Sequence, residues 1–85
     1  MNYAVTWTPH AEQELADVWV AAADRQAVAA ASYRLDGEIA TAPYGRGLPR
    51  GSPAVYTAVE LPLGIEYEVI EDDKKVRVLR VWSLV

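Results

Sequence analysis

Two stretches of the chain repeat apolar residues at the three- and four-residue spacing of an amphipathic helix. The first begins after Thr8-Pro9, a capping residue followed by a proline at the first helical position, and is expected to run to about Ala23. The second begins after the capping residue Asp24 and ends at Pro43. The apolar positions are Ala11, Leu15, Val18, Trp19 and Ala22 in the first helix, and Val28, Ala31, Leu35, Ile39 and Ala42 in the second. Because almost no linker separates them, we expect an αα-hairpin.

Four further segments have the composition or the alternation of strands. Residues 3–7 are short and β-prone, and three alternating segments follow the helices. Their core-facing positions are predicted as Val55, Thr57, Val59 and Leu61, then Ile65, Tyr67 and Val69, then Val76, Val78 and Trp82. The order β-α-α-β-β-β predicts one α+β domain over residues 1–85, with the αα-hairpin packed on one face of a small, mainly antiparallel sheet.

The two turns of the sheet determine which side chains share a face. A three-residue turn at residues 62–64 sets Leu61 opposite Ile65, whereas a two-residue turn would set Val59 opposite Glu66. We therefore predict the longer turn, with Gly64 supplying a positive φ. Asp72-Asp73 is predicted to form the second turn, which places Val69 by Val76, Tyr67 by Val78 and Glu68 by Arg77.

On this register the other face of the sheet carries Ile70, Leu79 and Val81, with no helix left to cover them. An uncovered apolar patch on a small domain often marks a partner site. A scatter of surface aliphatic residues explains the same pattern equally well, so both interpretations stay open.

Residues 43–53 differ from the rest, because three glycines and three prolines in eleven positions predict an irregular loop. Arg46 and Arg50 are its only charges, and arginine binds phosphate through a planar fork of donors. Tyr44 and Tyr56 are candidates for stacking on a base beside them. Arg77 and Arg80 could extend this surface, although simple alternation points them to opposite faces of the sheet. The alternative is that the loop arginines only solubilise the chain.

Composition limits the chemistry. The net charge of −4 argues against broad adhesion to nucleic acid, and the absence of cysteine excludes disulfides and thiolate sites. The single histidine, His10, provides no histidine pair, and Asp72-Asp73 is better explained as a turn than as a metal site. We expect no metal and no cofactor, and no catalytic residue can be named. No segment has the roughly 20 apolar residues of a membrane span, so a cytoplasmic protein is expected.

Several segments together resemble the RelE/ParE family of toxins from type II toxin–antitoxin pairs. They are residues 3–15 (YAVTWTPHAEQEL), residues 24–28 (DRQAV), Pro62-Leu63-Gly64 and residues 76–82 (VRVLRVW). The resemblance spans nearly the whole chain, in the right order and spacing. It implies a β-α-α-β-β-β toxin that a small antitoxin neutralises, and it leaves open whether toxin and antitoxin form larger oligomers.

The resemblance implies two possible targets. RelE-like members cleave mRNA on the ribosome with scattered basic residues, and ParE-like members inhibit DNA gyrase without a nuclease. The chain lacks the basic residue that the nucleases carry near Leu63-Gly64-Ile65, and it has Ser83-Leu84-Val85 where they place arginine and tyrosine. Only Arg46 and Arg50 match the family's basic loop. Three hypotheses remain: an mRNA nuclease, a gyrase inhibitor, and a binding module that has lost toxicity.

Overall fold

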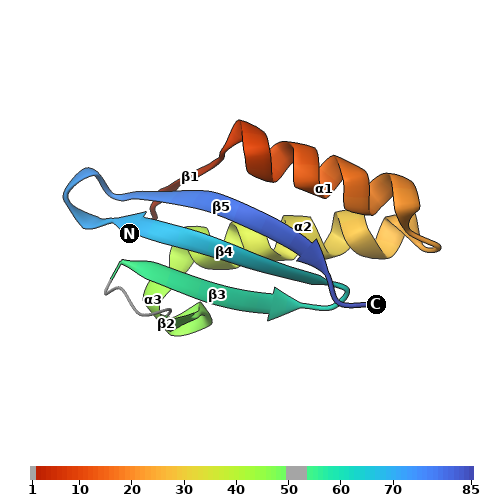
Figure 1. Ribbon diagram of the computed structural model, residues 1–85. Helices are drawn as coiled ribbons and strands as arrows, with labels where there is room; N and C mark the ends of the chain where they lie inside the picture. The colour runs from red at the N-terminus through yellow and green to blue at the C-terminus, as the bar shows by residue number, and fades with distance from the viewer. Residues whose placement is uncertain (1, 50–53) are drawn as a thin grey trace.

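The computed structural model describes residues 2–49 and 54–85, without the side chain of Arg46. The elements in chain order are β1 (Ala4–Trp7), α1 (Pro9–Ala21), α2 (Arg25–Thr41), α3 (Pro43–Arg46), β2 (Leu48–Pro49), β3 (Val55–Glu60), β4 (Leu63–Ile70), the 3-10 turn η1 (Glu71–Asp73) and β5 (Lys75–Ser83). The described strands form one sheet in the order β1-β5-β4-β3-β2 (Figure 1). Only the β1–β5 pair is parallel, so the predicted α+β fold with a mainly antiparallel sheet is confirmed.

Both long helices begin at the predicted capping residues. The Thr8 hydroxyl accepts a hydrogen bond from the Ala11 N–H at 3.1 Å, and Asp24 accepts one from the Ala27 N–H at 3.0 Å. Each of these bonds satisfies a backbone donor that has no partner within the helix. Four of the five predicted stripe positions of α2 are confirmed, since Val28, Ala31, Leu35 and Ile39 are all buried, whereas Ala42 is the exposed C-cap. Helix α1 ends at Ala21, two residues before the predicted end.

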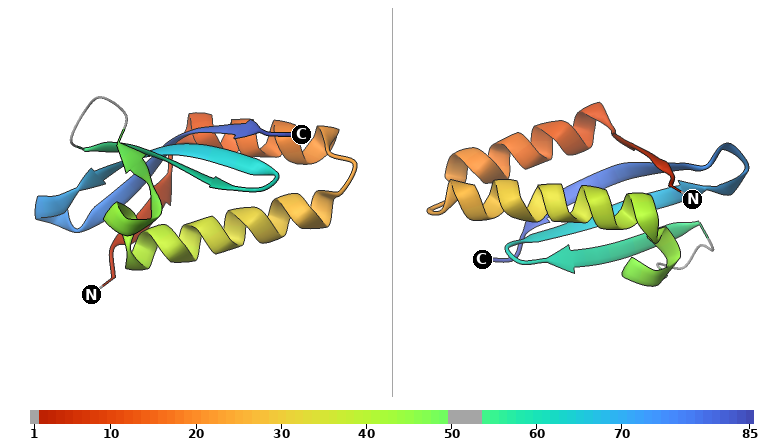
Figure 2. Two further views of the ribbon diagram at one scale, coloured as in Figure 1. Left: turned by 90° about the horizontal axis from the view of Figure 1, so that it is seen from below. Right: turned by 180° about the vertical axis from the view of Figure 1, so that it is seen from behind.

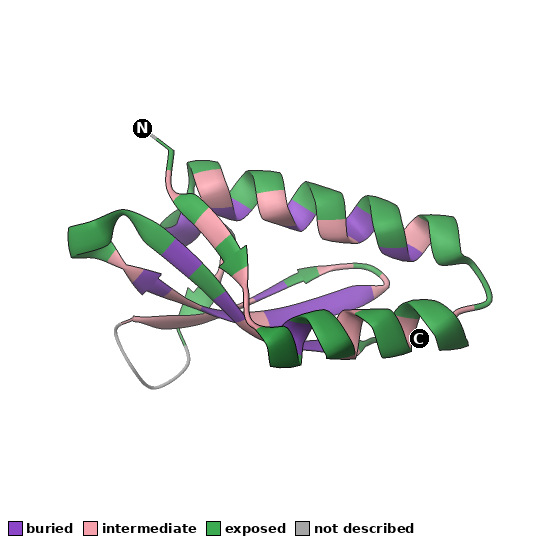
Figure 3. Ribbon diagram, turned by 90° about the horizontal axis from the view of Figure 1, so that it is seen from above, coloured by how far each residue is buried: buried purple, intermediate pink, exposed green. Residues whose placement is uncertain are grey.

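The two long helices have different relations to the sheet. Helix α2 crosses one face, whereas α1 lies along β5 beyond the short β1 (Figure 2). Their buried residues face the sheet and the exposed ones face outward (Figure 3). We call the face that α2 does not cover the open face. Within the described residues, no helix combines the length and the hydrophobicity that crossing a membrane requires.

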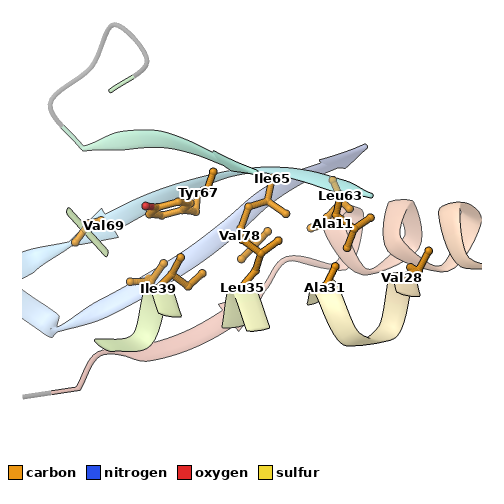
Figure 4. Packing of buried hydrophobic residues seen from close by; sticks show 13 residues of the cluster. Ala11, Val28, Ala31, Leu35, Ile39, Leu63, Ile65, Tyr67, Val69 and Val78 are labelled. Carbon is orange, nitrogen blue, oxygen red and sulfur yellow. The ribbon is translucent and has the colours of Figure 1, made fainter. Parts of the chain in front are cut away.

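The core lies between α2 and the central strands. Leu35 and Ile39 of α2 approach Ile65, Tyr67 and Val78 of the sheet (Figure 4). Tyr67 is the largest fully buried side chain, and its hydroxyl donates to the carbonyl of Pro43 at 2.5 Å. That bond satisfies the one polar atom of the ring and ties α3 to the sheet.

The turn between β3 and β4 differs from the prediction. It has two residues, Leu61 and Pro62, and it pairs Glu60 with Leu63 and Ala58 with Ile65. The two faces of strand β3 are therefore exchanged relative to the prediction, so that Tyr56 and Ala58 turn toward the core. Val59 and Leu61 are exposed. The predicted core positions of Val55 and Thr57 are also wrong.

Gly64 explains why the prediction failed. A Cβ atom at Gly64 would collide with the indole ring of Trp82, and its φ lies outside the left-handed region. The glycine is therefore needed for the close approach of a ring and not for the conformation of a turn.

Strand β5 begins in the predicted register, with Val69 opposite Val76 and Tyr67 opposite Val78. The register then shifts at a β-bulge, where Leu79 is the extra residue and Arg80 pairs with Glu66. The bulge turns Val81 into the core, at 3% exposure, so its predicted place on the open face is wrong. Trp82 moves to the open face over Gly64, which contradicts its predicted place in the core.

The bulge has a physical reason in the charges of β5. Strict alternation after Val78 would turn Arg80 toward the core, where an unpaired guanidinium is costly. The bulge keeps Arg80 exposed and puts Val81 in its place. The pairing of β5 with β1 ends at Val78, before the bulge. Beyond it, the Val81 N–H donates to the Glu14 carboxylate of α1 at 2.8 Å.

The segment predicted as an irregular loop contains two short regular elements, α3 and β2. Pro43 begins α3, where its missing N–H has no helical partner to lose. Gly47 follows α3 and lies so close to Tyr67 that any Cβ atom there would collide with the phenol. The glycine therefore lets the chain cross a buried ring on its way to β2.

Candidate interaction surfaces

The predicted binding residues Tyr44 and Tyr56 are brought together at one end of the sheet. Their ring centroids lie 5.6 Å apart in an edge-to-face arrangement. Tyr3 continues the row at 6.4 Å from Tyr44, and Tyr67 stacks on Tyr56 at 5.8 Å. Tyr44 remains 46% exposed, so this row of rings presents one aromatic edge to solvent.

Glu71 joins this tyrosine row to the β4–β5 turn. Its Oε1 accepts hydrogen bonds from the hydroxyls of Tyr3 at 2.8 Å and Tyr44 at 2.6 Å, and its Oε2 accepts one from Lys74. The bonds from Lys74, Tyr44 and Tyr3 lower the pKa of Glu71 to about 2. The bond to Glu71 raises the pKa of Tyr44 to about 12. Both groups therefore keep one protonation state near neutral pH and are unsuited to proton transfer there.

Arg46 and Arg50 stay predictions. The backbone of Arg46 ends α3, two residues after Tyr44, but its side chain and all of Arg50 lie outside the described residues. The proximity of α3 to the tyrosine row places the start of the predicted basic loop beside exposed aromatic rings.

Arg77 and Arg80 lie away from the tyrosine row. Because of the bulge they pair with Glu68 and Glu66 across β4 and share the open face, so the prediction of opposite faces is wrong. The Nε of Arg77 donates to Glu68 at 2.8 Å, and the Nη2 of Arg80 lies 3.1 Å from the Glu14 carboxylate. Each guanidinium therefore already has a carboxylate partner.

Glu14 is the centre of a small charged cluster at the edge of β5. Its carboxylate lies beside Arg80 and 3.4 Å from the Nε2 of His10. Partial burial alone would raise the pKa of Glu14, but the hydrogen bonds from Arg80 and the Val81 N–H outweigh this and leave it lowered. The charged carboxylate of Glu14 thus satisfies the Val81 N–H at the edge of the sheet. The described residues contain no group of three or more acidic or histidine side chains that could hold a metal ion.

The predicted antitoxin-binding patch on the open face is smaller than expected. Ile70 and Leu79 are half-buried, and Val81 belongs to the core. The open face also carries Glu66, Glu68 and the two paired arginines. The register adds Val55, Val59 and Trp82 to this face, so it has a mixed charged and apolar character.

A groove that the sequence prediction missed runs between α1 and α2. It has a volume of about 670 Å³. Its lining comprises Trp7, Glu12, Leu15, Ala16, Trp19, Val28, Ala29, Ser32, Tyr33 and Asp36. Trp19 is 42% exposed and Tyr33 is 82% exposed, so each helix presents one aromatic ring to solvent beside it.

We call the groove between α1 and α2 the helix groove, and its two ends carry different charges. Glu12 and Asp36 lie toward the end at Trp7, whose indole N–H donates to Asp36 at 2.8 Å. Arg25 stacks on the ring of Trp19 at 4.6 Å and donates to the carbonyls of Trp19 and Val20. The sequence feature that could have predicted this groove is a second stripe at helical spacing in each helix. It comprises residues 12, 15, 16 and 19 in α1 and residues 29, 32, 33 and 36 in α2.

Models of protein families give no match to this sequence, and neither do curated proteins. Solved structures do match. A chain of the toxin–antitoxin complex RelBE2 from Mycobacterium tuberculosis has a TM-score of 0.81 and 20% identity, over 98% of this chain and 99% of that one. The Escherichia coli toxin RelE has a TM-score of 0.73 and 20% identity, over 98% and 84%. The chromosomal ParDE system from Pseudomonas aeruginosa has a TM-score of 0.71 and 20% identity, over 98% and 97%. The chain thus has the fold of the RelE/ParE toxins.

Proposed function

We propose that this chain is the toxin component of a type II toxin–antitoxin pair and that a small antitoxin neutralises it by binding. The observation that carries the proposal is the fold likeness, which covers nearly all of both chains in the comparison with RelBE2. The sequence resemblance supports it independently, since it rests on residues spread from Tyr3 to Trp82.

The antitoxin binds in the groove between α1 and α2 as an amphipathic helix. Ala16 and Ala29 let a third helix approach closely, and Trp19 and Tyr33 offer large rings for contact. Basic residues at one end of the antitoxin helix would complement Glu12 and Asp36. This groove is a stronger candidate than the open face, where Glu66, Glu68 and two paired arginines lie among the partly exposed apolar side chains.

A protein target, DNA gyrase in this family, is favoured over mRNA. Cleavage of RNA requires free cationic groups at the scissile phosphate and a group that moves a proton. Arg77 and Arg80 are both paired with carboxylates, and the net charge of −4 repels a nucleic-acid backbone. The basic loop with Arg46 and Arg50 serves in either case as the surface that contacts the target.

Growth after induced expression in a bacterial host tests the proposal. The native chain should arrest growth, and the Arg46→Ala/Arg50→Ala variant should not, provided that both are soluble. Purified native chain should then inhibit supercoiling by gyrase and leave ribosome-bound mRNA intact. Cleavage of mRNA would reverse the choice of target. Normal growth with the soluble native chain would support the third hypothesis, a binding module without toxicity.

A further inference from the structure

A second cleft lies at the end of the molecule opposite the tyrosine row. The turn between α1 and α2 lies at the same end as the β3–β4 turn and the last described residues (Figure 1), and residues of all three line the cleft. The cleft has a volume of about 860 Å³. Its lining comprises Asp17, Val18, Ala21, Ala22, Ala23, Asp24, Ala27, Val28, Leu61, Pro62, Ser83 and Val85. We call it the end cleft.

The end cleft is apolar and has protruding edges. Its floor is formed mainly by alanine and valine side chains, which leave room for larger side chains from outside. Leu61 is 66% exposed and Val85 is 94% exposed, although each is a large aliphatic residue. Covering these two side chains together with the alanines would remove a continuous apolar surface from water, which is the main driving force for association.

The charges of the end cleft all have one sign. Asp17 and Asp24 are its only charged residues. Asp17 accepts a hydrogen bond from the Gln13 side chain at 2.9 Å and Asp24 accepts one from the Ala27 N–H at 3.0 Å, so both bonds come from neutral donors. The nearby Arg25 directs its guanidinium to the carbonyls of Trp19 and Val20. Two carboxylates without a cationic partner among the described residues therefore flank an apolar cleft.

We propose that the end cleft binds a segment of a partner protein that combines aliphatic side chains with lysine or arginine. The aliphatic side chains fill the space over the alanines, and the cations lie against Asp17 and Asp24. A second copy of this chain is disfavoured, because a symmetric contact would bring the carboxylates of both copies together. An anionic membrane surface is disfavoured by the same repulsion. This inference does not depend on the toxin function, since the end cleft and the helix groove have only Val28 in common among their lining residues.

A peptide titration followed by NMR tests the proposal. The probes are a synthetic amphipathic helical peptide of leucine and lysine and a matched peptide with glutamate in place of lysine. The lysine peptide should shift the amide signals of Val18, Ala22 and Leu61, and the glutamate peptide should bind at least tenfold more weakly. Asp17→Asn/Asp24→Asn should weaken binding of the lysine peptide by roughly tenfold, because two exposed charge pairs are lost. Asparagine retains both the cap of α2 and the acceptor for Gln13.

Two further variants separate the end cleft from the rest of the surface. Ala21→Trp fills the cleft from an exposed helical position and should abolish the shifts, whereas Tyr33→Ala in the helix groove should leave them unchanged. Circular dichroism confirms that each variant is folded. Equal binding of both peptides, or shifts that survive Ala21→Trp, would overturn the proposal. Concentration-dependent dimerisation that Ala21→Trp removes would overturn it in favour of a second copy.

Discussion

The contact between Gly64 and Trp82 allows a direct test of the register of the sheet. A Cβ atom at Gly64 would overlap the indole, and pairing with β3 and β5 fixes the backbone of β4 on both sides, so the ring has to move. Overpacking of this kind costs about 1–3 kcal/mol, so we expect Gly64→Ala to destabilise the fold by about 2 kcal/mol. For a domain of this size, that corresponds to a decrease in Tm of roughly 8–16 °C.

Removing the ring should reverse the sign of the effect. In a Trp82→Ala background the added methyl group has space, and alanine is favoured over glycine in a strand interior by about 0.5–1 kcal/mol. Gly64→Ala should therefore be neutral or slightly stabilising there, which gives a coupling energy of about 2–3 kcal/mol between the two positions. Urea denaturation of the four proteins, followed by circular dichroism, measures this cycle.

The alternative register predicts a different result. If Gly64 were a turn residue with positive φ, alanine would cost about 1 kcal/mol or more with or without Trp82. Equal destabilisation in both backgrounds would thus refute the two-residue turn, and with it the assignment of Tyr56 and Ala58 to the core.

Three other results are expected. Val81→Ala should destabilise the fold by about 2 kcal/mol in urea denaturation because Val81 is buried, whereas Leu79→Ala at the bulge should cost about 1 kcal/mol or less; the reverse order would contradict the bulge. Thr8→Ala should cost about 1 kcal/mol by removing the cap of α1, and Thr8→Ser should restore most of that stability. Because folding lowers the pKa of Glu71 from 4.5 to about 2, its contribution to stability is fully present above about pH 5 and is lost as pH falls towards 2; Tyr44→Phe should raise that pKa in an NMR titration.

The parts of the fold that could be predicted are those that local patterns specify. Thr8 and Asp24 mark helix starts because a side-chain oxygen there satisfies a backbone donor, whatever the rest of the chain does. The stripe of α2 and the pairing of Tyr67 with Val78 follow from periodicity in the same way. The caps and the α2 stripe depend on residues within a few positions of one another, and the pairing of Tyr67 with Val78 depends on the single turn between β4 and β5.

The features that were missed depend on contacts between distant segments. Gly64 was assigned to a turn because its contact with Trp82 is not visible in either strand alone. The bulge at Leu79 depends on Glu14 of α1, which replaces β1 as the partner of the β5 edge. The position of Glu71 beside Tyr44 likewise follows only from the assembled sheet.

The same limit applies to the candidate sites. Tyr44 and Tyr56 were expected to act together, and they do lie together. The helix groove was missed because Trp19 was assigned to the core stripe of α1, whereas it is 42% exposed.

The most direct test of the central claim is growth of cells that express this chain together with the protein encoded by the neighbouring reading frame. The native chain alone should arrest growth, and co-expression of the neighbour should restore it. A Trp19→Ala/Tyr33→Ala variant should remain toxic but escape neutralisation, because the loss of two aromatic contacts weakens binding by about 100-fold or more. Growth arrest that the neighbour relieves equally for both proteins would contradict the helix groove as the binding site. Normal growth in every arm, with soluble protein, would contradict the toxin function itself.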